Sequence, residues 1–115
     1  MTTASFKPSI LLITVDCLRA DHVGCLGYGH GRTPAIDMLA QKSLVFSKAL
    51  VAGSPTYNSF PALLAGRFPM AKGRDLLGLS PEETTLASHL QEQGYQTGAI
   101  VAGNPYVSRW QGYDR

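Results

Sequence analysis

Ser9-Ile-Leu-Leu-Ile-Thr-Val15 is a continuous, apolar and partly β-branched run, and Asp16 follows it directly. A run of this kind is typical of a strand buried on both faces of a parallel sheet. Residues 44–51 (LVFSKALV) and 95–102 (YQTGAIVA) are two further runs that predict strands. These three segments decide the expected fold class, because the stretches between them have the patterns of loops and helices.

Two helices are predicted between these strands. Thr33 and Pro34 are typical of an N-cap and a first helical position. Residues 58–65 predict a second, short helix that is capped by its first or second residue and ended by Gly66. Pro61 fits that helix only if it lies in the first turn, since proline has no backbone N–H to donate.

A third helix is predicted to begin at Ser80-Pro-Glu-Glu83, which matches a capping box with proline at the first helical position. We expect it to carry Leu86 and Leu90 inward and to stop at Gly94. Strands that alternate with helices predict an α/β fold with a mainly parallel sheet. Residues 1–115 are expected to form only the N-terminal part of it, truncated at the C-terminal end.

Composition describes an ordinary globular chain. The 115 residues are 44% hydrophobic and 16% charged, which fits one domain with a modest core and excludes a disordered tail. A net charge of +2, with ten scattered Lys and Arg residues read as a solvated surface, gives no nucleic-acid signal. The run 10–15 is too short for a membrane span and has no cleavage site after it, so a cytoplasmic location is expected, with no membrane partner.

Polar side chains follow the predicted strands. Asp16, Thr56 and Asn104 each come just after one, so we expect them at the same edge of the sheet, where ligands bind. A carboxylate on rigid backbone suits a divalent cation, although a solvated strand end is an open alternative for Asp16. Thr56 is predicted two residues before a helix N-terminus, where N–H groups favour phosphate or sulfate. An ordinary turn or capping threonine is the alternative there.

Two other patterns are weaker. Cys17, His22, Cys25 and His30 have the spacing C-x4-H-x2-C-x4-H, which does not match structural zinc motifs. We expect free thiols, with Cys17 as a small buried side chain beside the first strand. Residues 27–31 (GYGHG) lack the G-x-G-x-x-G spacing and predict a flexible loop. A nucleotide-binding domain that uses this loop remains a further alternative.

Taken in order, four segments resemble the sulfatase-type hydrolases of the sulfatase/alkaline phosphatase superfamily. Residues 10–29 (ILLITVDCLRADHVGCLGYG) are similar to the opening strand and first motif of that family, and residues 32–50 (RTPAIDMLAQKSLVFSKAL) to its next helix and strand. Residues 54–69 (SPTYNSFPALLAGRFP) resemble the nucleophile segment, and residues 80–104 (SPEETTLASHLQEQGYQTGAIVAGN) the helix and strand that follow. The resemblance implies a three-layer α/β sandwich.

The resemblance also implies roles for single residues. Asp16 falls on the first metal-binding aspartate of the family, and Cys17 stands where many sulfatases have a second. Thr56 falls on the cysteine or serine that becomes formylglycine, and threonine is not a substrate for that modification. Asn58 and Phe60 replace the proline and arginine of that motif, while its serine is kept. In this respect the chain resembles the phosphatase and phosphodiesterase branches of the superfamily, in which an unmodified threonine or serine is the nucleophile.

Ala102 and Asn104 stand where sulfatases have a lysine and a histidine, and Asn104 is expected to contact the ester. The resemblance implies a hydrolase of small-molecule sulfate or phosphate esters that depends on a divalent metal (calcium, zinc or manganese), with further ligands beyond Arg115. We expect the 115-residue chain to be inactive alone. The alternative is a degenerate family member or gene fragment that acts as a binding or structural module.

Overall fold

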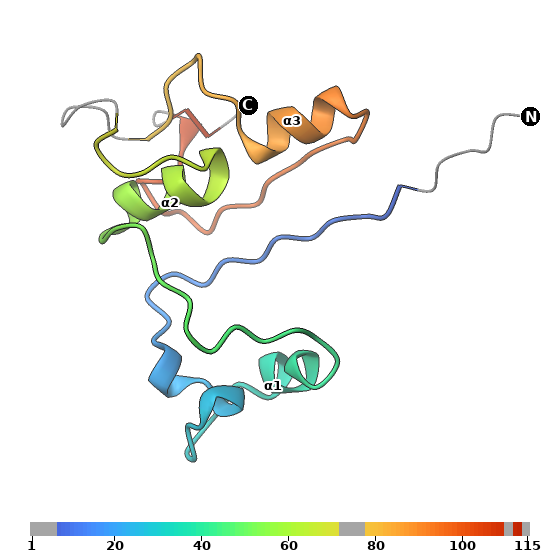
Figure 1. Cartoon of the computed structure of the whole chain (residues 1–115), viewed down its shortest axis with the longest axis vertical. Helices are drawn as coiled ribbons and strands as arrows, with labels where there is room; N and C mark the ends of the chain where they lie inside the picture. Colours follow the sequence, from blue (N-terminus) through green and yellow to red (C-terminus); the bar gives the residue numbers. More distant parts are fainter. Residues whose placement is uncertain (1–6, 72–77, 110–111, 114–115) are drawn as a thin grey trace, which may run out of the picture. The chain divides into compact units, whose positions relative to one another are not determined.

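The computed structural model describes residues 7–71, 78–109 and 112–113. Figure 1 shows short helical elements joined by long irregular segments. In chain order the elements are η1 (Ala20–His22), η2 (Gly24–Leu26), α1 (Pro34–Ala40), α2 (Thr56–Ala65) and α3 (Leu86–Glu92). The chain divides into two units, Met1–Ser47 and Lys48–Arg115, and each is described by itself. None of the described helices is long and apolar enough to cross a membrane.

The predicted strands at 9–15, 44–51 and 95–102 are not confirmed, because no residue in the described part of the chain is in a β-strand. A strand exists only where its N–H and C=O groups pair with a neighbouring strand. Residues 9–15 are instead an extended segment (Figure 1) whose side chains stay in water, with Leu11 84% and Ile13 70% exposed. A run patterned for burial on both faces needs neighbours on both sides, and these residues receive none here.

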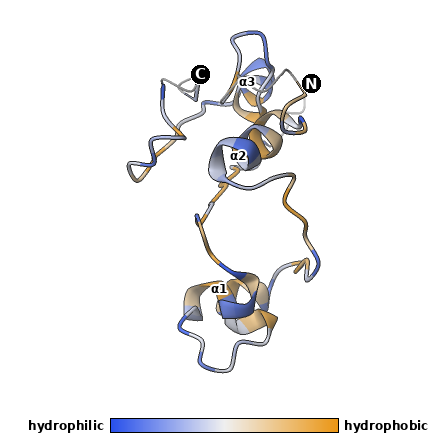
Figure 2. Ribbon diagram, turned by 90° about the vertical axis from the view of Figure 1, so that its left-hand side faces the viewer, coloured by the Kyte–Doolittle hydropathy of each residue, from blue (hydrophilic) through white to orange (hydrophobic). Residues whose placement is uncertain are grey.

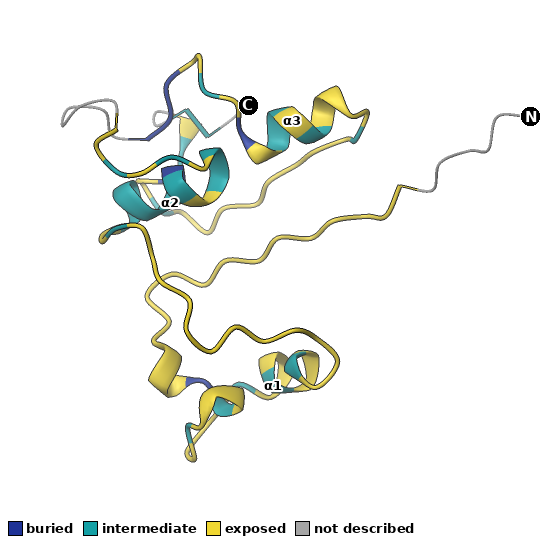
Figure 3. Ribbon diagram, in the orientation of Figure 1, coloured by how far each residue is buried: buried dark blue, intermediate teal, exposed yellow. Residues whose placement is uncertain are grey.

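Burial is sparse in both units. Buried apolar residues among those described are Val23, Leu79 and Val107, together with the fully buried Pro61. Dark blue in Figure 3 is accordingly confined to short pieces of the ribbon, and Figure 2 shows hydrophobic orange along irregular segments as well as helices. Since little apolar surface leaves water, the hydrophobic contribution to folding is small. Local hydrogen bonds therefore carry much of the order.

Helix α1 confirms its predicted start, with Thr33 as N-cap and Pro34 at the first helical position. The Thr33 hydroxyl does not cap its own helix, however. It accepts a hydrogen bond at 3.0 Å from the backbone N–H of Gly24 in η2. This bond ties the loop that follows Asp16 to the start of α1, so the N-cap residue joins two elements of the first unit.

Helix α2 begins at Thr56, two residues earlier than predicted, with Pro55 as its N-cap residue. Pro61 is consequently the sixth residue and not part of the first turn, which corrects the prediction. A proline inside a helix removes one bond of the ladder and costs about 3 kcal/mol, a loss that burial of its ring opposes. The predicted end is confirmed: Gly66 has a left-handed φ of 65° and its N–H donates to Ala62 O at 3.1 Å.

Helix α3 starts at Leu86, and its N-cap is Thr85 instead of the predicted Ser80. The Thr85 hydroxyl accepts from the N–H of Ser88 at 3.0 Å, and the Ser88 hydroxyl accepts from the N–H of Thr85 at 2.8 Å. Half of the predicted box also exists, since the Glu83 carboxylate accepts from the N–H of Ser80 at 2.6 Å. The Ser80 hydroxyl, though, donates to Glu82 at 2.7 Å, and the segment forms a turn.

The predicted stop of α3 at Gly94 is confirmed. Gly94 has a φ of 79°, its N–H donates to Gln91 O at 2.8 Å, and the N–H of Tyr95 donates to Leu90 O at 3.0 Å. This pair of bonds is a Schellman motif, which needs the left-handed residue that glycine supplies. The inward packing expected of Leu86 is wrong, because its side chain is 43% exposed.

The reciprocal cap at Thr85 predicts the behaviour of α3. Thr85→Ala removes the acceptor of the Ser88 N–H and should cost about 1 kcal/mol of helix stability. Backbone amides of α3 should then exchange with solvent about fivefold faster, as measured by NMR. Thr84→Ala is the matched control, because Thr84 is exposed and precedes the cap. Equal exchange in the two variants would show that the capping bonds do not hold this helix.

Candidate functional site

Asp16 lies in the first unit, at an exposed turn directly after the extended apolar segment. The thiol of Cys17 donates to Asp16 Oδ1 at 3.7 Å. Cys17 itself has a φ of 57°, a left-handed conformation that costs a non-glycine residue about 1–2 kcal/mol. Cys17 is exposed, and not buried as expected. Backbone outliers of this kind concentrate at functional sites, so the strained turn is consistent with a role for Asp16.

The loop that follows Asp16 is organised by Asp37 on α1. Its Oδ1 accepts from the N–H of Cys25 at 2.7 Å, and the Thr33 hydroxyl lies 3.2 Å from each carboxylate oxygen. The carboxylate therefore joins η2 to α1 across twelve residues of chain. We did not single out Asp37 from the sequence. The only local signal was an acidic residue one turn after the N-cap, which is ordinary in helices.

Gly24 is required by the same arrangement. A Cβ atom at this position would lie 2.4 Å from Asp37 Oδ2 and 2.9 Å from Asp37 Cγ. Gly29, in the neighbouring loop, would meet nothing within 4 Å. A depression of about 570 Å³ beside these residues is lined by Gly24, Tyr28, Asp37 and Val45 among others, and it does not include Asp16. Its lining also includes the free thiol residue Cys25, whose backbone N–H donates to the Asp37 carboxylate.

A charged and aromatic cluster lies on the surface of this loop. Arg19 Nη2 lies 2.5 Å from the Asp21 carboxylate, and His22 Nδ1 lies 3.1 Å from it. Hydrogen bonds from Arg19, and to a smaller extent from His22, hold the pKa of Asp21 well below its usual range. Tyr28 stacks on His22 with ring centroids 4.7 Å apart, and its ring meets that of His30 at 5.9 Å. The Arg19, Asp21 and His22 side chains are exposed, so their ion pairs contribute little to stability.

Within residues 7–71, 78–109 and 112–113, no three His, Cys, Asp or Glu side chains are arranged to hold a metal ion. Cys17 and Cys25 are both free thiols. Asp16 supplies one hard oxygen ligand that fits a divalent cation. A catalytic metal usually takes three or more protein ligands, so Asp16 fits such a site as one member of it.

Thr56 is the first residue of α2 and is half-buried. It lies inside the helix, which corrects the prediction that it precedes the N-terminus by two residues. The Asn58 side chain donates to Ser54 O at 3.1 Å, and the Ser59 hydroxyl donates to Thr56 O at 3.3 Å. The Thr56 hydroxyl is thus carried on a bonded first turn, at the helix end where the dipole favours an anion.

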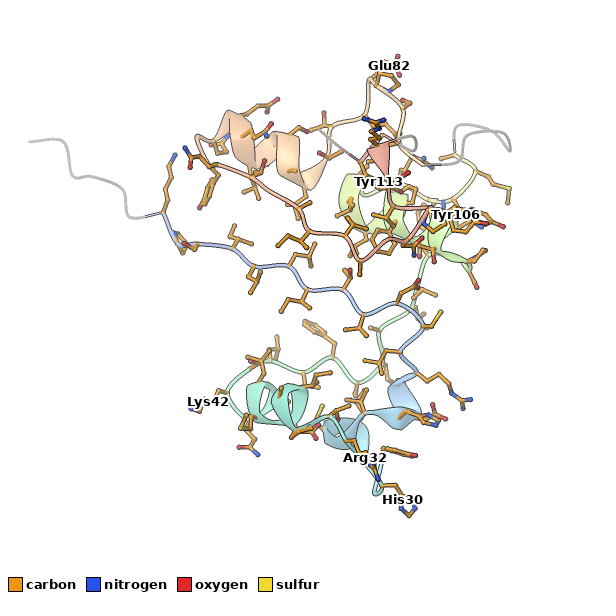
Figure 4. All side chains as sticks on the ribbon, turned by 180° about the vertical axis from the view of Figure 1, so that it is seen from behind. His30, Arg32, Lys42, Glu82, Tyr106 and Tyr113 are labelled. Carbon is orange, nitrogen blue, oxygen red and sulfur yellow. The ribbon has the colours of Figure 1, made fainter. Side chains whose placement is uncertain are left out.

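Asn104 lies in the same unit as Thr56. Its Oδ1 accepts from the N–H of Tyr106 at 2.9 Å, and the Tyr106 ring meets that of Tyr57 with centroids 5.5 Å apart. Figure 4 shows Tyr106 beside α2. The structure therefore brings Tyr57, which follows Thr56, together with Tyr106, whose N–H donates to Asn104. The common sheet edge stays a prediction, and Asp16 belongs to the other unit.

A polar cluster that the sequence did not indicate lies at the other end of α2. Arg67 was grouped with the solvated basic residues, yet its side chain is only 12% exposed and forms an ion pair with Glu83, which is 7% exposed. Arg67 Nη2 also donates to Gly78 O at 2.5 Å. The hydroxyl of Tyr113 is buried, and burial raises the pKa of this phenol to about 12.

Comparison with known proteins gives one consistent result. The Sulfatase family model matches residues 8–112. The chain is 38% identical to Arylsulfatase D from Homo sapiens over 86% of its length and 19% of that protein. It is 35% identical to Steryl-sulfatase from Rattus norvegicus (81% and 18%) and 38% identical to Arylsulfatase A from Bos taurus (87% and 21%). The chain spans about a fifth of the length of these relatives. No solved structure matches it.

The contact between Gly24 and Asp37 generates a prediction. Gly24→Ala should push the Asp37 carboxylate away and lengthen its bond to the Cys25 N–H, because the added methyl occupies the position of Oδ2. The Cys25 amide should exchange faster by about fivefold or more, for a loss of about 1 kcal/mol. Gly29→Ala is the control. If both variants leave Cys25 as protected as in the wild type, the Asp37 hub does not organise the loop.

Proposed function

The chain belongs to the sulfatase family, and we propose that it contributes the N-terminal part of the active site of a metal-dependent hydrolase of sulfate or phosphate esters. Family membership implies the α/β fold class. We further propose that residues 9–15, 44–51 and 95–102 become parallel strands of a three-layer sandwich once neighbouring strands pair with them. The exposed apolar side chains of Leu11, Leu50 and Ile100, one from each range, support this.

The observation that carries the proposal is the position of Thr56. It begins a ten-residue helix, and its neighbour Tyr57 contacts Tyr106, whose N–H is held by Asn104. A nucleophilic hydroxyl and an amide contributed by distant segments thus belong to one neighbourhood. The helix N-terminus there favours the negative charge that a phosphate or sulfate group brings.

The proposed reaction uses Thr56 Oγ as an unmodified nucleophile. The Thr56 hydroxyl gives up its proton as Oγ forms a bond to the phosphorus or sulfur. The bond to the ester oxygen breaks, and that oxygen takes up one proton, which balances the one lost by Thr56, and leaves as the alcohol. Water then releases inorganic phosphate or sulfate from Oγ. Because Asn104 Oδ1 already accepts from Tyr106, the part of Asn104 suited to an ester oxygen is its Nδ2, a donor.

Asp16 is proposed as one ligand of the divalent metal, whose identity among calcium, zinc and manganese is open. Its exposed carboxylate on a strained turn supports this role. A metal bound there would supply stabilisation of the negative charge on the transferring group. The chain provides few ligands by itself, and we propose that residues 1–115 are inactive without the rest of a sulfatase domain.

A second candidate is a non-catalytic member of the family that acts as a binding or structural module. Phe60 and Ala102 favour it, because they stand where the resemblance implies an arginine and a lysine. Phe60 packs against Tyr113, with ring centroids 6.3 Å apart. Its position thus serves packing and supplies no cation. Measurement of turnover decides between the two candidates.

Thr56→Ala should abolish ester hydrolysis in a polypeptide that contains this chain and a complete sulfatase domain. We expect a loss of kcat/KM of at least about a thousandfold, since no other hydroxyl takes over a nucleophile. Assays of aryl phosphates and aryl sulfates should show preference for phosphate, and mass spectrometry should find plain threonine at position 56. Thr84→Ala is the matched control. Robust aryl sulfatase activity that survives Thr56→Ala would contradict the proposal.

Asp16→Asn should remove metal from the same polypeptide. The neutral amide is a poorer ligand than a carboxylate for a hard cation, so metal content measured by mass spectrometry should fall about tenfold or more. Asp21→Asn is the control, because Asp21 is an exposed carboxylate of the same loop that pairs with Arg19. Equal metal content in both variants and the wild type would remove Asp16 from the site.

A further inference from the structure

The ion pair between Arg67 and Glu83 differs from the surface pairs of this chain. Its side chains are 12% and 7% exposed, whereas those of Arg19 and Asp21 are 71% and 63% exposed. An exposed ion pair is screened by water and contributes little to stability. A buried pair loses hydration on both sides, so it persists only with good geometry and further hydrogen bonds.

The further hydrogen bonds are present. Arg67 Nε donates to Glu83 Oε1, and Arg67 Nη2 donates to Gly78 O at 2.5 Å. The second oxygen of Glu83 accepts from the N–H of Ser80 at 2.6 Å, and the N–H of Glu83 donates to Ser80 O at 3.1 Å. One guanidinium is thereby tied to the backbone of the segment 78–83, directly and through the carboxylate.

This cluster begins two residues after Ala65, the last residue of α2. Gly66 ends the helix in a left-handed conformation, and Arg67 follows it. Earlier on the same helix, Phe60 meets Tyr113 edge-on at 6.3 Å and Tyr57 meets Tyr106 at 5.5 Å. The Tyr113 hydroxyl is buried close enough to the pair to feel both charges. Helix α2 is therefore held at its start, its middle and its end.

We propose that Arg67 is a positioning residue, whose buried ion pair with Glu83 anchors the end of α2 and so fixes the helix that carries Thr56. Two aromatic contacts allow a helix to rock, because ring–ring contacts tolerate a range of angles. A guanidinium fork with two acceptors fixes direction as well as distance. The anchoring stands on the contacts alone, and its consequence for Thr56 rests on the proposed function.

Hydrogen exchange on residues 1–115 tests the anchor without any activity. In Arg67→Gln and in Glu83→Gln, the amides of Asn58 and Ser59, which donate to Pro55 O, should exchange about tenfold faster or more. In the double variant these amides should exchange no faster than in either single variant, since the two groups act as a unit. The amide of Asp37 in α1 serves as internal control. Unchanged exchange, or strictly additive effects, would overturn the anchor.

Titration of Tyr113 distinguishes loss of the pair from general unfolding. The positive charge of Arg67 lowers the pKa of this phenol and the negative charge of Glu83 raises it, against a larger increase from burial. In a folded chain, Glu83→Gln should therefore lower the pKa below about 12 and Arg67→Gln should raise it further. Tyr113→Phe identifies the phenolate absorbance. A fall of the Tyr113 pKa to its ordinary value in both variants would mean unfolding. The exchange experiment on Arg67→Lys then decides. Intermediate protection of the α2 amides is expected, and wild-type protection would contradict the anchor.

Kinetics of the polypeptide with a complete sulfatase domain test the effect on Thr56. Arg67→Gln should lower kcat by about a hundredfold, because a misplaced nucleophile reacts slowly, while KM should change little. The kcat of Arg67→Lys should lie between those of the wild type and Arg67→Gln. Full kcat in Arg67→Gln would overturn the positioning role. If the wild type hydrolyses no ester, the proposed function fails, and the exchange and titration results still decide whether the anchor exists.

Discussion

Pairing between neighbouring strands is the interaction on which the architecture of this chain depends. The runs 9–15, 44–51 and 95–102 have the composition of strands buried on two faces, but their backbone groups find no ladder partners among the described residues. Apolar composition alone does not make a strand, since each strand satisfies its N–H and C=O groups through another. Helices satisfy theirs within one segment, which is why α1, α2 and α3 are formed while no strand is found among the described residues.

The absence of described strands places unusual weight on a few polar contacts. In the first unit, the Asp37 carboxylate and the Thr33 hydroxyl join η2 to α1. In the second unit, Arg67 and Glu83 join the end of α2 to the turn that precedes α3. In both units a charged side chain on or beside a helix receives backbone donors or acceptors from a loop. Such bonds define one arrangement more sharply than the sparse apolar contacts do, because they are directional.

The candidate site residues are likewise positioned by a helix and a few contacts. Thr56 is the first residue of α2, and Asn104 is linked to the start of this helix through Tyr106 and Tyr57. Asp16 lies in the first unit, where it accepts from the thiol of the strained Cys17. Thr56 and its surroundings therefore lie within one unit of this sulfatase-family chain. Asp16 lies in the other unit, and the described residues contain no group of three side chains that could hold a metal ion.

The sequence by itself determined the family, the N-cap at Thr33, and the helix ends at Gly66 and Gly94. The family rests on four segments in order along the chain. The N-cap and the two helix ends rest on residues within one turn of each other, where side-chain type decides backbone conformation directly. The start of α3 was placed five residues too early, since two overlapping capping patterns compete and only local packing chooses between them. Tertiary structure alone decided the Asp37 hub, the burial of Arg67 and the contact of Tyr57 with Tyr106. Those pairs join residues 12, 16 and 49 positions apart, and no periodicity in a sequence specifies which distant partner a side chain meets.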